Sequence, residues 1–214
     1  MKKIFFSILI FGFFVFAQVK GLLLTPPDQY MGQVQKLMYV HVPAAWNSFI
    51  SFFIVFVSSI LFLIRKNLFW DHLAASAAEI GCVLTALTLA LGSTWGRPTW
   101  GVWWTWDPRL TTTAILFLLY VGYVSFRGFI PSAIKRAKLA APLGVIIFLN
   151  VPIVYYSVRW WRTLHQVQSS PKTVDPQMVL ALRLNAFAFL GVLILFLYFR
   201  TRLQILRHRK MEAM

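Results

Sequence analysis

Residues Val42–Ile64 read VPAAWNSFISFFIVFVSSILFLI, and this run decides the fold class of the chain. It contains no charged residue, and its length matches the roughly 20 residues that a helix needs to cross about 30 Å of hydrocarbon. Lipid offers no water to pair with backbone N–H and C=O groups, so a helix is the form that such a run takes in a membrane. The run therefore predicts a membrane-spanning α-helix.

Further runs along the chain have the same character. Of the 214 residues, 59% are hydrophobic and 13% are charged, which is about half the charged share of a soluble globular domain. We predict an all-α, polytopic integral membrane protein, with six transmembrane helices in one membrane domain over residues 1–214. The approximate spans are residues 4–24, 42–64, 73–93, 111–129, 139–157 and 178–199. Pro142, Asn150 and Pro152 interrupt the fifth of these spans.

The formal net charge of +15 is distributed unevenly between the two ends of the predicted spans. Thirteen Lys and Arg residues lie at the end that includes Lys2 and Lys3, six lie at the opposite end, and two lie within spans. Basic residues gather on the cytoplasmic side of membrane proteins, so we expect both termini in the cytoplasm. The segments 28–40, 94–108 and 159–177 then face outside. Charge spread over many loops argues against nucleic-acid binding, which needs one basic surface.

The first span has a second interpretation, as a signal peptide. Lys2 and Lys3, an apolar stretch and the small residue Ala17 resemble a signal sequence with a cleavage site. However, the apolar character resumes at Val19 and continues to Leu24, which is longer than a signal core requires. We expect a retained helix, and cleavage would leave the sidedness of the other spans unchanged.

Cys82 is the single cysteine of the chain and lies in the third span. One cysteine excludes an intrachain disulfide, a zinc site of several thiolates and the C-x-x-C redox motif. The C-x-x-C-H motif that attaches haem covalently is also missing from the sequence. Any haem held by this chain would therefore be bound non-covalently.

The segment 94–110 carries an unusual concentration of indole rings. Five of the nine tryptophans lie in WGRPTWGVWWTWDPRLT, which begins at Trp95. Such a cluster suits either a flat apolar ligand or the headgroup layer of a membrane. If the segment formed a short surface helix, one face would carry Trp100, Trp103, Trp104 and Asp107. Pro108 disfavours helical geometry at Asp107, so we expect Asp107 to be the N-cap of the fourth span.

Two histidines lie on the same side of the membrane as this tryptophan segment. His41 lies at the outer end of the second span, shortly before Trp46, whereas His165 follows Trp160 and Trp161 in the last outer segment. On a helix, Trp161 and His165 would share a face. Eight of the nine tryptophans lie on or near the outer side, whereas a general aromatic belt would occupy both interfaces. The remaining histidines lie beside basic residues at cytoplasmic ends and are expected to be solvated: His72 and His208.

Two imidazoles near a cluster of indoles fit non-covalent, bis-histidine ligation of a haem, with aromatic rings packed on the porphyrin. We expect His41 and His165 to be the axial ligands of the iron of haem b. Outer arginines are candidates for pairing with the haem propionates, and they are Arg97, Arg109, Arg159, Arg162 and Arg183. Arg183 lies about two turns into the last span, where an arginine usually has a partner. The remaining candidate haem-contact residues are Trp95, Trp100, Trp103, Trp104, Trp106, Asp107, Trp160 and Trp161.

These stretches resemble a known family. WGVWWTWDPRLT is similar to the tryptophan-rich "WWD" signature of the haem-handling proteins of cytochrome c biogenesis, with Pro108 in place of the expected alanine. Within that superfamily, MYVHVPAAW, GSTWGRPTWG and LNVPIVYYSVRWWRTLHQ resemble the haem exporter protein C family (CcmC, HelC). The matching blocks extend from His41 to Gln166 in the expected order, which is over half of the chain.

The resemblance implies a role and a set of partners. Proteins of this family hold haem at the outer face of a bacterial inner membrane, or of an organellar inner membrane, and pass it to a periplasmic haem chaperone. They work with the ATPase and membrane subunits of an ABC transporter and with a small single-span helper, within membrane lipid. The role is ligand transfer, and the sequence contains no nucleophile–base pair typical of an enzyme.

Two other classes of protein remain as alternatives. A b-type cytochrome would also use paired histidines, but would carry them within facing helices rather than at helix ends. A transporter of small apolar solutes would need interrupted helices and polar groups at the middle of the membrane. The interruption of the fifth span is the feature that favours a transporter, and a structural kink explains it equally well.

Overall fold

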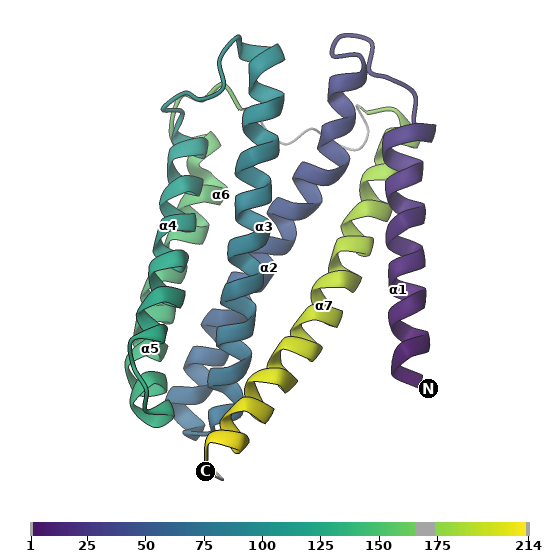
Figure 1. Ribbon diagram of the computed structural model, residues 1–214. Helices are drawn as coiled ribbons and strands as arrows, with labels where there is room; N and C mark the ends of the chain where they lie inside the picture. Colours follow the sequence, from purple (N-terminus) through teal and green to yellow (C-terminus); the bar gives the residue numbers. More distant parts are fainter. Residues whose placement is uncertain (1, 166–173, 213–214) are drawn as a thin grey trace.

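Every predicted span is helical, the fifth as two helices, in the computed structural model, which describes residues 2–165 and 174–212 (Figure 1). The elements in chain order are α1 (Lys2–Gln18), the π-helical turn η1 (Val19–Leu24), the 3-10 turn η2 (Gln33–Leu37), α2 (Met38–Arg65), α3 (Leu68–Trp100), α4 (Pro108–Gly128), α5 (Ala133–Phe148), α6 (Asn150–Trp160) and α7 (Pro176–Glu212). Within the described residues, six stretches are long and apolar enough to cross a membrane. This number confirms the prediction of six transmembrane helices.

The fifth of these stretches is divided into α5 and α6, as its prolines predicted. The break falls at Leu149, and Pro142 lies inside the continuous helix α5. Pro152 has no N–H to offer the carbonyl four residues earlier, which explains why the helix is interrupted just there. The side-chain amide of Asn150 donates a hydrogen bond of 3.1 Å to the carbonyl of Thr112 on α4. The break is therefore held against a neighbouring helix.

The core of the bundle lies among α2, α3 and α4, and buried residues of α5, α6 and α7 complete it. The α2-facing side of α3 carries small residues, including Ala74, Ala78 and Gly81, which let membrane helices approach closely. A Cβ atom at Gly81 would lie 2.4 Å from a ring carbon of Phe52, so only glycine fits there. The ring of Phe52 in turn stacks on that of Tyr120, with centroids 3.7 Å apart. This arrangement fixes the relative positions of α2, α3 and α4 below the site.

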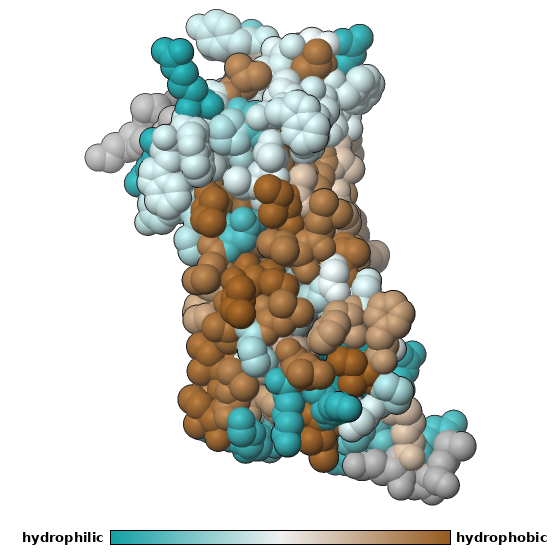
Figure 2. All heavy atoms as spheres, turned by 90° about the vertical axis from the view of Figure 1, so that its left-hand side faces the viewer, coloured by the Kyte–Doolittle hydropathy of each residue, from teal (hydrophilic) through white to brown (hydrophobic). Residues whose placement is uncertain are grey.

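The surface of the bundle is typical of a protein immersed in lipid. Figure 2 shows an apolar band around the middle of one face, with more polar residues toward both ends. Large apolar side chains are exposed along α1, including Ile4, Phe6 and Phe11. In water such a surface would be unfavourable, whereas hydrocarbon accommodates it. The exposed band therefore agrees with a membrane-spanning bundle.

Candidate functional site

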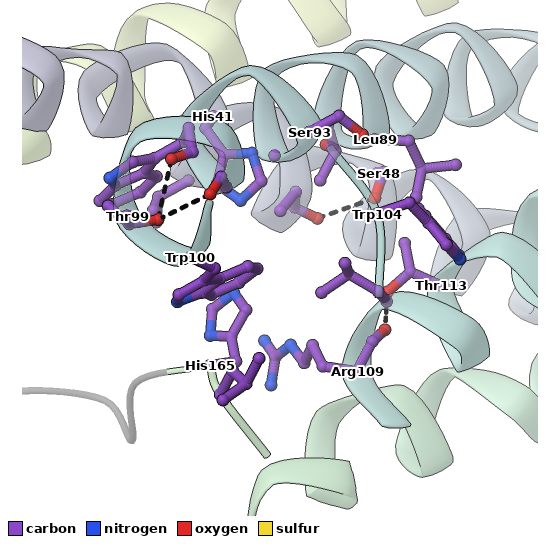
Figure 3. Close-up of a pocket in the computed structure, with 18 of the residues that line it drawn as sticks. His41, Ser48, Leu89, Ser93, Thr99, Trp100, Trp104, Arg109, Thr113 and His165 are labelled. Carbon is purple, nitrogen blue, oxygen red and sulfur yellow. Dashed lines mark hydrogen bonds between the residues drawn. The ribbon is translucent and has the colours of Figure 1, made fainter. Parts of the chain in front are cut away.

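A pocket opens at the end of the bundle where α2 begins, α3 ends and α4 begins. We call it the aromatic pocket. It encloses about 1150 Å³ including its open mouth. Its walls include His41, His165, Trp95, Trp100, Trp104 and Arg109, as Figure 3 shows for most of them. Half of the twelve predicted site residues therefore meet around one pocket.

His41 lies one turn into α2, and its ring is packed tightly against α3. The side chain is buried, and its ring meets that of Trp95 edge to face, with centroids 5.9 Å apart. A Cβ atom at Gly92 would lie 3.1 Å from Cε1 of His41, so the absence of a side chain at position 92 makes room for the imidazole. Among the described residues, neither Nδ1 of His41 nor Nε1 of Trp95 has a hydrogen-bond partner, although both are buried. Two buried polar atoms at one pocket are thus left for a ligand to satisfy.

His165 approaches the same pocket from the segment that follows α6 (Figure 3). This segment is tied to the start of α4 by Asp107, which is buried. One carboxylate oxygen of Asp107 accepts a hydrogen bond of 2.9 Å from the backbone N–H of Arg109 and so caps α4, as predicted. The other oxygen accepts hydrogen bonds from Thr163 Oγ1 at 2.6 Å and from the N–H of Leu164 at 2.7 Å. Thr163 Oγ1 in turn accepts a hydrogen bond of 3.0 Å from the N–H of His165.

The tryptophan segment does not form the short surface helix that one interpretation of its sequence predicted. Helix α3 runs on to Trp100 and ends because Gly101 adopts a left-handed conformation, with φ of 79°, that residues other than glycine rarely adopt. Residues 101–107 follow without helical structure. The single face expected for Trp100, Trp103, Trp104 and Asp107 is therefore wrong: Trp100 and Trp104 line the pocket, whereas Trp103 is 60% exposed. Trp106, which was not assigned to that face, is 83% exposed.

The tryptophans that precede His165 also lie away from the pocket lining. Helix α6 ends at Trp160 and Trp161 is extended, so the shared helical face expected for Trp161 and His165 does not exist. Both tryptophans are exposed, and the ring of Trp160 stacks on that of Tyr156 at 5.4 Å between centroids. Together with Trp103 and Trp106 they place four exposed indoles on loops and helix ends at the pocket end of the bundle.

Of the candidate arginines among the described residues, Arg109 is the one that lines the pocket. Its Nη1 donates a hydrogen bond of 3.4 Å to the carbonyl of Tyr155, which leaves further N–H donors of the guanidinium for a ligand. The guanidinium of Arg97 instead bonds the carbonyl of Gly101 at the end of α3. Arg183 is exposed on α7 and makes no ion pair with another described residue, so the partner expected for it is not found there.

The sequence also contained a signal for pocket residues that were not predicted. Thr88, Gly92 and Thr99 line the pocket from α3 beside Trp95, and their spacing is that of one helical face. The predicted span ended at residue 93 and the tryptophan segment began at residue 94, which divided this face between two units. Met31 and Ser48 also line the pocket, and no pattern in the sequence singles them out.

The chain is similar to known proteins over its whole described length. A family model described as heme exporter protein C matches residues 2–214. A heme exporter protein C of Bradyrhizobium diazoefficiens is 36% identical over 190 residues, which cover 87% of this chain and 72% of the relative. The heme exporter protein C of Escherichia coli is 37% identical over 166 residues, covering 77% of this chain and 68% of the relative.

A relative from a plant extends the comparison to organelles. A mitochondrial protein of Marchantia polymorpha, described as ccmC-like and as a protein of cytochrome c biosynthesis, is 41% identical over 144 residues. The match covers 67% of this chain and 60% of that relative's length. The aligned relatives thus come from both bacteria and mitochondria.

Proposed function

This chain belongs to the haem exporter protein C family, and from that premise we propose that it handles haem at a membrane during cytochrome c biogenesis. The cargo, haem b, is held non-covalently in the aromatic pocket between His41 and His165. The observation that carries the proposal is the meeting of these two histidines, from segments far apart in sequence, around one largely apolar pocket. Nδ1 of His41 is buried and has no hydrogen-bond partner among the described residues. This fits the assignment, because the lone pair of such a nitrogen can bind iron.

The indoles divide into two groups with different proposed roles. Trp95, Trp100 and Trp104 line the pocket and offer flat faces against which a porphyrin can pack. Arg109 lines the same pocket and supplies a cation for a propionate. Arg183 and Trp161, which were also candidate haem contacts, lie outside the lining, and the proposal gives them no contact with the porphyrin.

The exposed tryptophans suit the handover of the haem. Trp103, Trp106, Trp160 and Trp161 are exposed at the end of the bundle where the pocket opens. We assign them to the membrane interface and to the surface that meets a periplasmic haem chaperone, because exposed indoles are enriched in both environments. Partners at the membrane would be the ATPase and membrane subunits of an ABC transporter and a small single-span helper.

The proposed orientation of the protein in the membrane follows from its charge distribution. With the basic ends of the helices in the cytoplasm, the aromatic pocket faces the periplasm of a bacterium or the corresponding side of an organellar inner membrane. Haem held there can be passed to a periplasmic chaperone without crossing the bilayer. His41 near the start of α2 and His165 in a connecting segment also differ from the facing mid-helix histidines expected of a b-type cytochrome.

Haem titration of the purified chain in detergent tests the proposal. The ferric form should develop the low-spin optical spectrum of bis-imidazole ligation as one haem binds per chain. Mixing the loaded chain with a soluble periplasmic chaperone domain should then transfer the haem, measured after the two are separated by affinity capture. A chain that bound haem only in proportion to detergent, with no low-spin spectrum, would refute the proposal.

A further inference from the structure

A second cavity lies at the opposite end of the bundle, between the start of α3, the end of α4, the start of α5 and the end of α7. We call it the basic cavity. It encloses about 1190 Å³ including its mouth. Five of its lining side chains are Arg or Lys, and Glu79 is the one acid that lines it. Such a surplus of cations around the basic cavity favours an anionic ligand.

Two of these arginines are already neutralised by carboxylates. Arg127 forms two hydrogen bonds with buried Asp71, at 2.7 and 2.8 Å. Arg200 forms an ion pair with Glu79, which also accepts a hydrogen bond of 3.2 Å from Gln204. These pairs sit on α3, α4 and α7 and form the fixed wall of the cavity.

The other three cations have no carboxylate partner among the described residues. They are Arg136 on α5 and Arg207 and Lys210 on α7. Arg136 donates one hydrogen bond of 3.2 Å to the carbonyl of Ile130, and a guanidinium has five N–H donors. The start of α5 and the end of α7 thus bring three cations with spare donors to one cavity.

We propose that the basic cavity binds the phosphate group of an anionic phospholipid. Arginine presents a planar fork that matches the geometry of phosphate oxygens, and a lysine adds a further charge. Basic pockets between membrane helices on the cytoplasmic side suit lipid headgroups, and this end of the helices is the cytoplasmic one on the sidedness proposed above. Val124 and Met211 also line the cavity, so a headgroup bound there would meet apolar side chains as well as cations.

The test compares two double variants of the full chain that remove the same charge from the same two helices. Arg136→Gln/Arg207→Gln removes two cavity cations. Lys138→Gln/Arg209→Gln removes two exposed cations of α5 and α7 that do not line the cavity. Native mass spectrometry in detergent measures how much chain retains phosphatidylglycerol, phosphatidylcholine or inorganic phosphate as each is titrated. Thermal unfolding in lipid-free detergent verifies that both variants fold, and Lys210→Gln provides a milder third variant.

We expect one tight phosphatidylglycerol per chain, with an affinity that falls by roughly tenfold or more in the cavity variant and stays near that of the parent in the matched control. Displacement of this lipid by inorganic phosphate would support recognition of the phosphate group itself. If the cavity bound inorganic phosphate and showed no preference for phosphatidylglycerol over phosphatidylcholine, its ligand would be free phosphate and not a lipid. Equal losses in the two double variants, or equal retention of both lipids, would overturn the site. None of these measurements involves haem, so they stand apart from the test of the proposed function.

Discussion

Asp107 and Thr163 are joined by a hydrogen bond of 2.6 Å that ties the beginning of α4 to the segment carrying His165. The same carboxylate oxygen accepts the N–H of Leu164, and Thr163 accepts the N–H of His165. Asp107 therefore does more than cap a helix. It is a positioning residue for His165, although it does not line the aromatic pocket itself.

Asp107→Ala should weaken haem binding as well as the fold. Loss of the cap costs about 1 kcal/mol, and the backbone N–H of Leu164 loses the carboxylate that accepts its hydrogen bond. With His165 no longer held, the low-spin spectrum should become partial at haem concentrations that saturate the parent chain. Thr163→Val should reproduce the spectral change, whereas Thr94→Val, on an exposed turn of α3, should not. An Asp107→Ala chain with lowered stability but an unchanged spectrum and haem affinity would limit Asp107 to the helix cap.

His41→Ala and His165→Ala should each remove the low-spin spectrum, because bis-imidazole ligation needs both nitrogens. Added imidazole should restore it partly, and more readily in His165→Ala, since His165 is less buried than His41. His72→Ala and His208→Ala are the controls, because both side chains line the basic cavity at the other end of the bundle. His72 is buried there, so the expectation that it would be solvated is wrong. A normal spectrum in His41→Ala would show that the ligand assignment is wrong.

Gly92→Ala should disturb the site without replacing either of the proposed histidine ligands. Its Cβ would lie 3.1 Å from Cε1 of His41, so the imidazole must shift, at a cost of about 1–3 kcal/mol. We expect haem affinity to fall several-fold while the amount of protein in the membrane stays normal. Gly122→Ala on α4 is the matched control, since nothing lies within 4 Å of a Cβ there. The close approach would be irrelevant to binding if both variants took up haem equally.

The two groups of tryptophans should separate in a comparison of double variants. Trp100→Ala/Trp104→Ala removes pocket walls, at about 1–3 kcal/mol for each well-packed ring, and should lower haem affinity strongly. Trp103→Ala/Trp106→Ala removes exposed rings and should leave affinity near normal while slowing transfer to the chaperone. Haem titration and the transfer assay measure the two effects. Equal loss of affinity in both pairs would contradict the division.

Sidedness can be tested with single cysteines in a Cys82→Ser background. Tyr30, at the pocket end, is 96% exposed, and Lys135, at the start of α5, is exposed at the other end. In intact cells a membrane-impermeant thiol reagent should label Tyr30→Cys and should label Lys135→Cys only after the membrane is opened. The reverse pattern would invert the topology and place the aromatic pocket in the cytoplasm.

The fold was predictable because an apolar run of about 20 residues in lipid must satisfy its own backbone hydrogen bonds, and a helix does so. The sequence also marked an interruption of the fifth span at Pro142, Asn150 and Pro152, although Pro142 lies within a continuous helix and the break falls beside the other two residues. The cap at Asp107 followed from the Asp-Pro pair in the same way. Each of these features depends on residues close together in sequence.

The site was only partly predictable, since its walls are set by contacts between distant segments. Gly101 ends α3 within the tryptophan segment, so some neighbouring indoles line the pocket and others are exposed. The hydrogen bond between Asp107 and Thr163 joins residues 56 positions apart, so no local pattern in the sequence predicts it. Gln166, the last residue of the stretch that resembled the family, lies outside the described residues.

The break at Leu149 has a mechanical consequence for the two histidines. His41 stands on α2, which packs along α3, whereas His165 is tied through Asp107 to α4, which packs against α6. Because α5 contacts α2 and α6 contacts α4, the interruption lets the fifth span follow a different helix on each side of it. The two halves of the span thus brace the supports of the two histidines separately, α5 on the side of His41 and α6 on the side of His165. Because Phe52 of α2 also stacks on Tyr120 of α4, these two supports stay joined below the pocket.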